Sequence, residues 1–193
     1  IYSLVGPSGS GKSTLLNLIS LIDKPSRGFI KLDNFKINEN DIDQKDTIRS
    51  KKIGIIYQDK NLLSDFTTLE NVYMARLSMS NNRKKAIMDA KSLIKKVGLE
   101  KRLDHFPSEL SGGESQRVAI SRALINSPDI ILADEPTGNL DHKNATEIFK
   151  LLFSLKNKKR IIIFATHNRY FADMSDCKLS LINGRVNTVN ARN

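Results

Sequence analysis

The chain has 193 residues, of which 39% are hydrophobic and 27% charged, so it can bury the core of one domain. Its formal net charge of +10 is interspersed with acidic residues, which leaves nucleic acid, an anionic membrane surface and an acidic protein open as partners. The single cysteine excludes an internal disulfide, and no apolar run approaches the ~18 residues of a membrane-spanning helix.

Four short runs of apolar, β-branched residues predict strands that are buried on both faces. They cover residues 1–5, 53–57, 130–133 and 161–165. Runs of this kind are typical of a parallel sheet with helical crossovers, and such sheets bind ligands at the carboxyl ends of their strands. Because the first run begins with nothing before it, we expect the natural chain to start further upstream.

The loop after the first run matches the phosphate-binding pattern G-x-x-x-x-G-K-[ST], and a helical run follows it. Glycines let backbone N–H groups turn inward around phosphate oxygens, and a helix N-terminus favours an anion. Lys12 adds positive charge for the β- and γ-phosphates, and the Ser13 hydroxyl can bind Mg²⁺. A glycine- and serine-rich loop that only caps a helix is the alternative. The predicted nucleotide-binding residues are Gly6, Pro7, Ser8, Gly9, Ser10, Gly11, Lys12, Ser13 and Thr14.

Two patterns predict antiparallel hairpins. Residues 29–37 carry Asp33-Asn34 in the middle, and residues 179–189 carry Asn183-Gly184, which suits a type I′ turn. We expect the tail from Asn187 onward to fray. These hairpins predict a small antiparallel part beside the parallel sheet.

Between residues 58 and 127 the pattern changes to helical spacing. In 83–97, for example, apolar residues recur every three or four positions and form one face of a helix. We interpret 58–127 as a helical lobe inserted into a core made of 1–57 and 128–193. The whole chain is then a single, N-terminally incomplete domain.

Residues 110–117, Leu-Ser-Gly-Gly-Glu-Ser-Gln-Arg, permit two interpretations. Ser111 and Glu114 form a capping box, which needs no ligand. That box leaves Gly112 and Gly113 unexplained, because glycine lowers helix propensity. Glycines there suit a backbone that comes close to something, and an exposed helix N-terminus binds anions. Since the chain has one phosphate loop, we expect Ser111, Gly112 and Gly113 to serve the nucleotide of a partner copy.

Two adjacent carboxylates, Asp134 and Glu135, follow the third strand run. Because successive strand side chains point to opposite faces, we expect the two acids to have different roles. Asp134 is the candidate Mg²⁺ ligand, and Glu135 is the candidate general base for an attacking water. Two solvated acids at a strand end are the alternative.

The phosphate loop, the 110–117 segment and the two acids together resemble the ABC ATPase family, with 110–117 as its signature motif. The resemblance covers essentially all 193 residues. It implies an α/β P-loop NTPase fold with a mainly parallel core sheet flanked by helices, a small antiparallel β part and an inserted helical lobe. It also implies ATP and Mg²⁺ as cofactors and a homodimer in the ATP-bound state.

Three more residues take roles from this resemblance. Gln58 resembles the glutamine that binds Mg²⁺ and senses the γ-phosphate, and His167 resembles the histidine that contacts the γ-phosphate. Both count as candidate catalytic residues beside Glu135. Asp141 resembles the aspartate of the loop that crosses the dimer interface. The family's adenine-stacking aromatic residue lies upstream of Ile1, so no residue of this chain is assigned to it.

Within the family, a transporter subunit with separate permease chains is favoured. The stretch between Lys12 and Ser111 has no heptad run and no CxxC motif, which sets the chain apart from DNA-repair relatives. Residues 57–72 and 133–141 resemble the lipoprotein-releasing group. That group implies LolC/LolE-like transmembrane permease partners, no nucleic-acid partner, and peripheral association with the cytoplasmic face of the bacterial inner membrane.

Other interpretations stay open. The macrolide-exporter and cell-division groups of the same family are alternatives, and a soluble ATPase acting on nucleic acid is an alternative of a different class. By analogy the segment after Gln58 meets the permease, with Leu62, Leu63 and Phe66 as candidate contacts. Burial of these three in the helical lobe is the competing interpretation.

Overall fold

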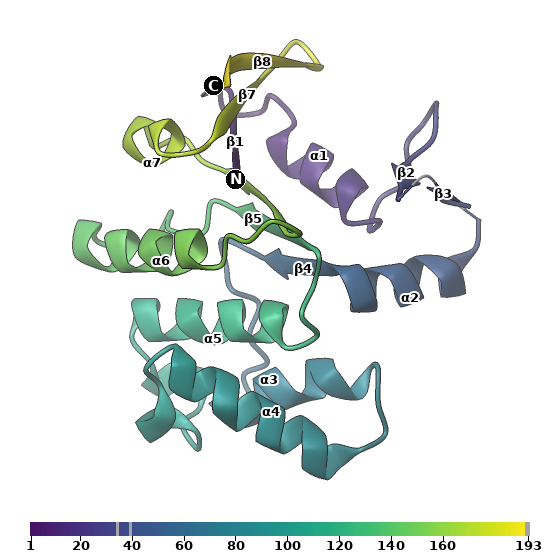
Figure 1. The fold of residues 1–193 in the computed structure, drawn as a ribbon. Helices are drawn as coiled ribbons and strands as arrows, with labels where there is room; N and C mark the ends of the chain where they lie inside the picture. The colour runs from purple at the N-terminus through teal and green to yellow at the C-terminus, as the bar shows by residue number, and fades with distance from the viewer. Residues whose placement is uncertain (34, 39, 192–193) are drawn as a thin grey trace.

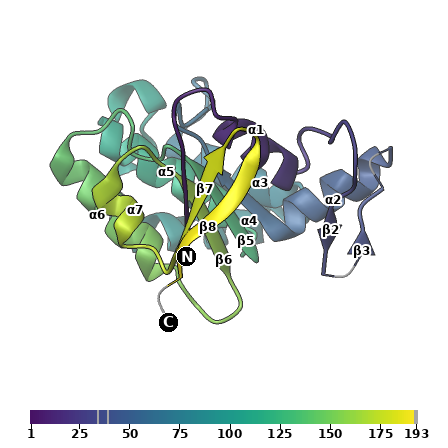
Figure 2. The same ribbon diagram turned by 90° about the horizontal axis from the view of Figure 1, so that it is seen from above.

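The computed structural model describes residues 1–33, 35–38 and 40–191. Its centre is a six-stranded sheet in the order β4-β5-β6-β1-β7-β8, with helices on both faces (Figures 1 and 2). The strands are β1 (Tyr2–Val5), β4 (Ile53–Ile56), β5 (Ile130–Asp134), β6 (Ile161–Ala165), β7 (Cys177–Ile182) and β8 (Arg185–Ala191). All neighbours are parallel except β7 and β8, so the predicted parallel sheet is confirmed.

Each face of the sheet packs against its own helices. Leu4, Leu132 and Ala165 face the side of α1 (Lys12–Ile19) and α2 (Ile42–Lys52). Ile131 and Phe164 face the other side, with α5 (Gly112–Leu124), α6 (His142–Ser154) and α7 (Arg169–Asp173). Burial on both faces explains why the strand runs are continuously apolar.

The hairpin at 179–189 is confirmed, but its place in the fold was not predicted. Its first strand, β7, lies parallel to β1, with Tyr2 opposite Cys177 and Val5 opposite Ser180. Asn183 and Gly184 have φ values of 50° and 74°, as a type I′ turn requires. The expectation of a frayed tail from Asn187 was wrong, because β8 continues to Ala191.

The hairpin at 29–37 is also confirmed and forms a separate two-stranded sheet. Strand β2 (Lys31–Leu32) pairs antiparallel with β3 (Phe35–Lys36). Asn34, which was expected in the turn, lies outside the described residues. The helix that follows, α2, was not predicted. All of its residues are described, and none is buried. A helix without fully buried side chains needs no apolar periodicity in its sequence, which is why the pattern did not predict it. Asp41 caps the helix by accepting from Gln44 N–H at 2.8 Å.

The middle of the chain is helical, as expected. It holds α3 (Thr68–Leu77), α4 (Arg83–Lys96), two single 3₁₀ turns (Glu100–Arg102 and Pro107–Glu109) and then α5. These helices share a core cluster that includes Val72, Ile94 and Val118. Helix α5 also gives Ile120 and Leu124 to the core of the sheet, so it packs on both sides. The division at residues 58 and 127 stays a prediction.

Among the described residues, no helix combines the length and the apolar character that crossing a bilayer requires.

Candidate functional site

Four loops at the carboxyl ends of neighbouring strands enclose a cavity of about 430 Å³. The loops follow β1, β4, β5 and β6, which are adjacent in the sheet. The cavity therefore gathers predicted residues that lie up to about 160 positions apart in the chain, as expected for a parallel α/β sheet. Its lining residues are Ser8, Gly9, Gly11, Lys12, Ser13, Thr14, Gln58, Asp134, Glu135 and His167.

The phosphate loop curls over the N-terminus of α1. Gly11 stands at the start of the helix with φ 96°, a left-handed conformation that glycine adopts without strain. Gly11 offers no side-chain acceptor to the first N–H groups of α1. The Nζ atom of Lys12 lies over the same loop and donates to the carbonyl oxygens of Gly6 at 3.0 Å and Pro7 at 3.1 Å. This arrangement suits an anion.

Glu135 and His167 come from adjacent strand ends and lie close together. Nδ1 of His167 is 3.1 Å from Oε2 of Glu135, while the His167 side chain is 75% exposed and that of Glu135 is 14% exposed. Glu135 has φ 43°, which is uncommon for a residue other than glycine and is held by a bond from its N–H to the Ala165 carbonyl. Strained backbone of this kind concentrates at functional sites.

The expectation that strand alternation separates Asp134 from Glu135 was wrong. β5 ends at Asp134, and the left-handed turn at Glu135 breaks the alternation of side chains. Both carboxylates consequently line the same cavity. The prediction that the two acids have different roles can therefore no longer rest on opposite faces of a strand.

Gln58 packs against the loop that follows Glu135. A Cβ added at Gly138 would lie 2.9 Å from Nε2 of Gln58, so the two loops are in close contact. Arg122, a residue that sequence reasoning missed, holds the loop of Gln58 by donating to the carbonyls of Lys60 and Asn61. The available clue was one charged residue in the mainly apolar helix segment 118–124.

The predicted signature residues lie outside the lining of this cavity. Ser111 caps α5 by accepting from Glu114 N–H at 3.3 Å, and the Glu114 carboxylate accepts from Ser111 N–H at 2.8 Å. The capping box is thus confirmed. Arg102 donates to Glu114 at 2.9 Å, and this bond, with the Ser111 N–H, lowers the pKa of Glu114 to about 2.

The two signature glycines have a reason within the chain itself. A Cβ at Gly113 would lie 2.6 Å from Oδ1 of Asn144, and a Cβ at Gly112 would lie 3.1 Å from a methyl carbon of Leu140. The close approach that we attributed to a ligand is therefore also an approach of α5 to the start of α6. The glycines alone do not point to a nucleotide.

Asp141 also lies outside the cavity lining and caps α6. Its carboxylate accepts from Asn144 N–H at 3.0 Å, and the pKa of Asp141 is lowered chiefly by this bond. Asp141 and the signature residues are thus joined through Asn144. A role for Asp141 at a dimer interface stays a prediction.

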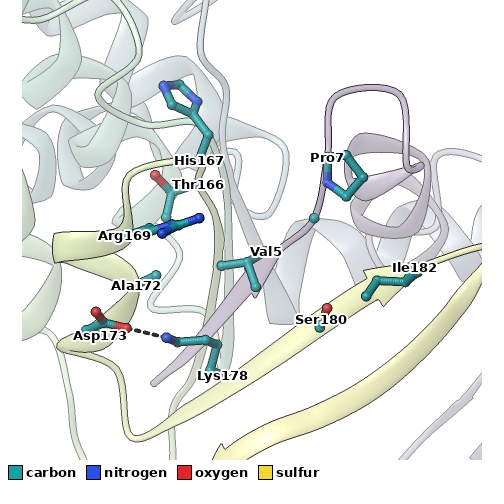
Figure 3. Close-up of a pocket in the computed structure, with 11 residues that line it drawn as sticks. Val5, Pro7, Thr166, His167, Arg169, Ala172, Asp173, Lys178, Ser180 and Ile182 are labelled. Atoms are coloured by element: carbon teal, nitrogen blue, oxygen red, sulfur yellow. Dashed lines mark hydrogen bonds and ion pairs between the residues drawn. The ribbon is translucent and has the colours of Figure 1, made fainter.

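A larger cavity of about 570 Å³ shares His167 with the cavity described above (Figure 3). Gly6 and Pro7 line it, and so does His167, which borders both cavities. On its far side Lys178 pairs with Asp173, and His167 points away from that pair. The predicted metal ligands and catalytic residues all line the smaller cavity. Ser10 of the phosphate loop is half-buried, with its hydroxyl oxygen shielded from solvent.

The candidate permease contacts are spread over different environments. Leu62 packs on the helical-lobe cluster, whereas the Leu63 residue is 45% exposed. Phe66 is half-buried. A groove of about 390 Å³ runs between α2, β4, α3 and α5, and its lining includes Arg49, Ser78 and Arg122. Among the described residues, the candidate permease contacts are not part of that lining.

The chain matches the family model described as ABC transporter over residues 1–138. It is 47% identical to the lipoprotein-releasing system ATP-binding protein LolD of Rickettsia bellii, over 97% of this chain and 83% of that protein. It is 43% identical to the LolD protein of Cytophaga hutchinsonii, over 96% of this chain and 85% of that protein.

The fold is similar to a solved dimeric structure of the ATP-binding cassette MJ0796 in a post-hydrolysis state with ADP and Pi. The TM-score is 0.89 at 39% identity, and the match covers 100% of this chain and 86% of that one. The predicted fold class is therefore confirmed.

Proposed function

Because this chain belongs to the ABC transporter family and is an ATP-binding, ATP-hydrolysing subunit, we propose that it drives the release of lipoproteins from a membrane. It would do so as two copies that act on separate permease chains. The observation that carries the ATPase part is the single cavity in which the phosphate loop meets Gln58, Asp134, Glu135 and His167.

The cavity has the donors that Mg²⁺ takes. The hydroxyl of Ser13, the side-chain oxygen of Gln58 and the carboxylate of Asp134 are hard oxygen ligands, and all three line the cavity. When bound, Mg²⁺ supplies positive charge to the phosphate oxygens during transfer. We assign these three residues to the metal.

The remaining residues divide the work of hydrolysis. Lys12 and the N–H groups at the start of α1 bind the phosphates. Glu135 accepts a proton from a water molecule as the water oxygen attacks the γ-phosphorus, and the bond to the ADP oxygen breaks. His167 lies 3.1 Å from Glu135, and we assign it to orient that carboxylate and to contact the γ-phosphate when ATP is bound. Catalysis of this kind depends mainly on positioning.

A second copy completes the site. Ser111, Gly112 and Gly113 lie outside the cavity of their own chain, and the similar cassette MJ0796 is described as dimeric with ADP and Pi. We assign the signature residues and Asp141 to the partner's nucleotide and its surroundings. ATP then holds two copies together, and hydrolysis loosens them.

The permease contact is assigned to the groove between α2, α3 and α5. It is an open hollow of about 390 Å³ that adjoins the loop of Gln58 through Arg122. The proposal for the cargo and the permease partners is supported by the relatives, which are named for lipoprotein release. We therefore propose LolC/LolE-like permeases and a place at the cytoplasmic face of the bacterial inner membrane. Macrolide-exporter and cell-division complexes are the alternatives.

Purification from the protein's own membranes tests the transporter part. The tagged chain should bring down a set of lipoprotein-releasing permease subunits, identified by mass spectrometry. A large side chain in the groove, Ser78→Arg, should abolish this recovery, whereas Ser92→Arg on the exposed face of α4 should not. A different permease would replace the cargo, and recovery of only soluble or DNA-bound partners would overturn the transporter role.

A further inference from the structure

We propose that Arg122 is a positioning residue that fixes the loop of Gln58 to the helix carrying the signature residues, and so couples the two nucleotide sites of the dimer. The inference rests on the proposed function. Nη1 of Arg122 donates to the carbonyl oxygen of Asn61 at 2.6 Å, and Nη2 donates to that of Lys60 at 2.6 Å. One guanidinium thus clamps two consecutive carbonyls.

The clamped loop has a conformation that needs support. Lys60 and Asn61 have φ values of 55° and 47°, and two consecutive left-handed residues other than glycine are uncommon. The planar fork of arginine matches two carbonyls in a fixed geometry, which the single ammonium of lysine cannot reproduce. Burial lowers the pKa of Arg122, yet an arginine stays charged in proteins, so the clamp persists across the physiological pH range.

Helix α5 joins the clamp to the signature. It begins after its cap Ser111, and Arg122 lies three turns further along, a distance of roughly 16 Å at the rise of an α-helix. Val118, Ile120 and Leu124 are buried along its length, which makes it a rigid element. A movement at Ser111 therefore reaches the carbonyls of Lys60 and Asn61, which lie two and three residues beyond Gln58.

The two ends of this connection serve different nucleotides. Gln58 lines the cavity of its own chain, whereas the signature residues are assigned to the partner's nucleotide. Loss of the γ-phosphate at one site would shift α5, and the clamp would pass that shift to Gln58 at the other site. Arg122 also lines the groove assigned to the permease. Its side chain therefore adjoins the loop of Gln58, the helix of the signature residues and the permease groove.

Arg160 provides a matched control for a purely structural role. Its guanidinium also bonds to two carbonyls: Nε donates to the carbonyl oxygen of Pro128 at 3.0 Å, and Nη1 donates to that of Leu155 at 3.3 Å. It precedes β6, at the amino ends of the strands and hence at the opposite edge of the sheet from the cavity. Replacing Arg160 removes a comparable pair of arginine–carbonyl hydrogen bonds and leaves the loop of Gln58 unchanged.

The test compares Arg122→Lys and Arg122→Gln with Arg160→Lys and Arg160→Gln in the full-length protein. For the Arg122 variants we expect kcat to fall roughly 10-fold to 100-fold, the size of effect that misplaced catalytic groups produce, with the Kd for a fluorescent ATP analogue nearly unchanged. The Hill coefficient for ATP should fall toward one. The Arg160 variants should lower the melting temperature but keep kcat and the Hill coefficient. Equal kcat in wild type and a folded Arg122→Lys variant would overturn the proposal.

A measurement on the wild-type chain covers the case in which no Arg122 variant folds. Hydrogen exchange of the amides at 60 and 61 should be as slow as that in the last turns of α5, because the clamp makes them one unit. Fast exchange of the loop beside a protected α5 would contradict the inference. A wild-type chain without ATPase activity would instead defeat the proposed function itself, so the two failures are distinguishable.

Discussion

Nδ1 of His167 and Oε2 of Glu135 lie 3.1 Å apart, so the ends of β6 and β5 bring an imidazole and a carboxylate into close contact at the lining of one cavity. Glu135 is mostly buried and backbone-strained, whereas His167 is largely exposed. The two residues should therefore respond differently to substitution.

Replacing Glu135 with glutamine should stop turnover while sparing ATP binding. The amide cannot accept the proton of the attacking water, so phosphate release should fall by roughly 100-fold or more, the usual size of a general-base contribution. Unhydrolysed ATP should then hold a dimer that gel filtration detects. The exposed Glu100→Gln is the matched control. Rapid hydrolysis by Glu135→Gln would remove this residue from the mechanism.

Replacing His167 with alanine should reduce turnover without loss of stability. Because its side chain is 75% exposed, the free energy of unfolding should change by no more than about 0.5 kcal/mol. The kcat should fall roughly 10-fold to 100-fold, since the Glu135 carboxylate loses the group that orients it. Steady-state kinetics and a melting curve check both points, with the exposed His142→Ala as control. Unchanged kcat would show that His167 does not position Glu135.

Gly113→Ala should destabilise the junction of α5 and α6. The added Cβ would lie 2.6 Å from Oδ1 of Asn144, and overpacking of this kind costs about 1–3 kcal/mol. Gly112→Ala should cost less, because its Cβ meets only the end of the flexible Leu140 side chain at 3.1 Å. Denaturant unfolding measures both, and Asn144→Ala should relieve the Gly113→Ala variant in a double-mutant cycle. Equal costs for the two glycines would disprove the contact.

Acid should weaken the signature cap through Glu114. Its folded-state pKa is lowered from 4.5 to about 2, so the stabilisation is complete above pH 4.5 and disappears as the pH falls toward 2. Its size should be roughly 1–2 kcal/mol after screening by solvent. The stability gap between wild type and Glu114→Gln, measured by urea unfolding, should narrow across this interval. A gap that is constant from pH 6 to pH 2.5 would rule out the ionised cap.

The sequence predicted which residues share one cavity better than it predicted the backbone conformation around them. Gln58, Asp134 and His167 could be placed together because each follows a buried strand, and parallel strands end at one edge. The left-handed turn at Glu135 could not be predicted from the sequence, because the Glu135 N–H bonds to the carbonyl of Ala165, 30 residues further along the chain. Strand alternation therefore gave the wrong relation between the two acids.

Two other features were missed for similar physical reasons. Helix α2 has no buried residue among its described positions, so the periodicity that identified other helices was missing. The contacts of Arg122 are to backbone carbonyls, which any residue type at Lys60 and Asn61 would offer. Contacts of that kind become visible only when the chain is folded.

The packing of Gly113 on Asn144 has a consequence for assembly. The Asn144 N–H donates a hydrogen bond to the Asp141 carboxylate, so the signature helix and the loop before α6 form one connected surface within a single chain. A second copy would meet that surface already shaped, and would not need to order two separate segments on contact. Less conformational entropy is then lost on association, which leaves more of the nucleotide's binding energy to hold the pair closed.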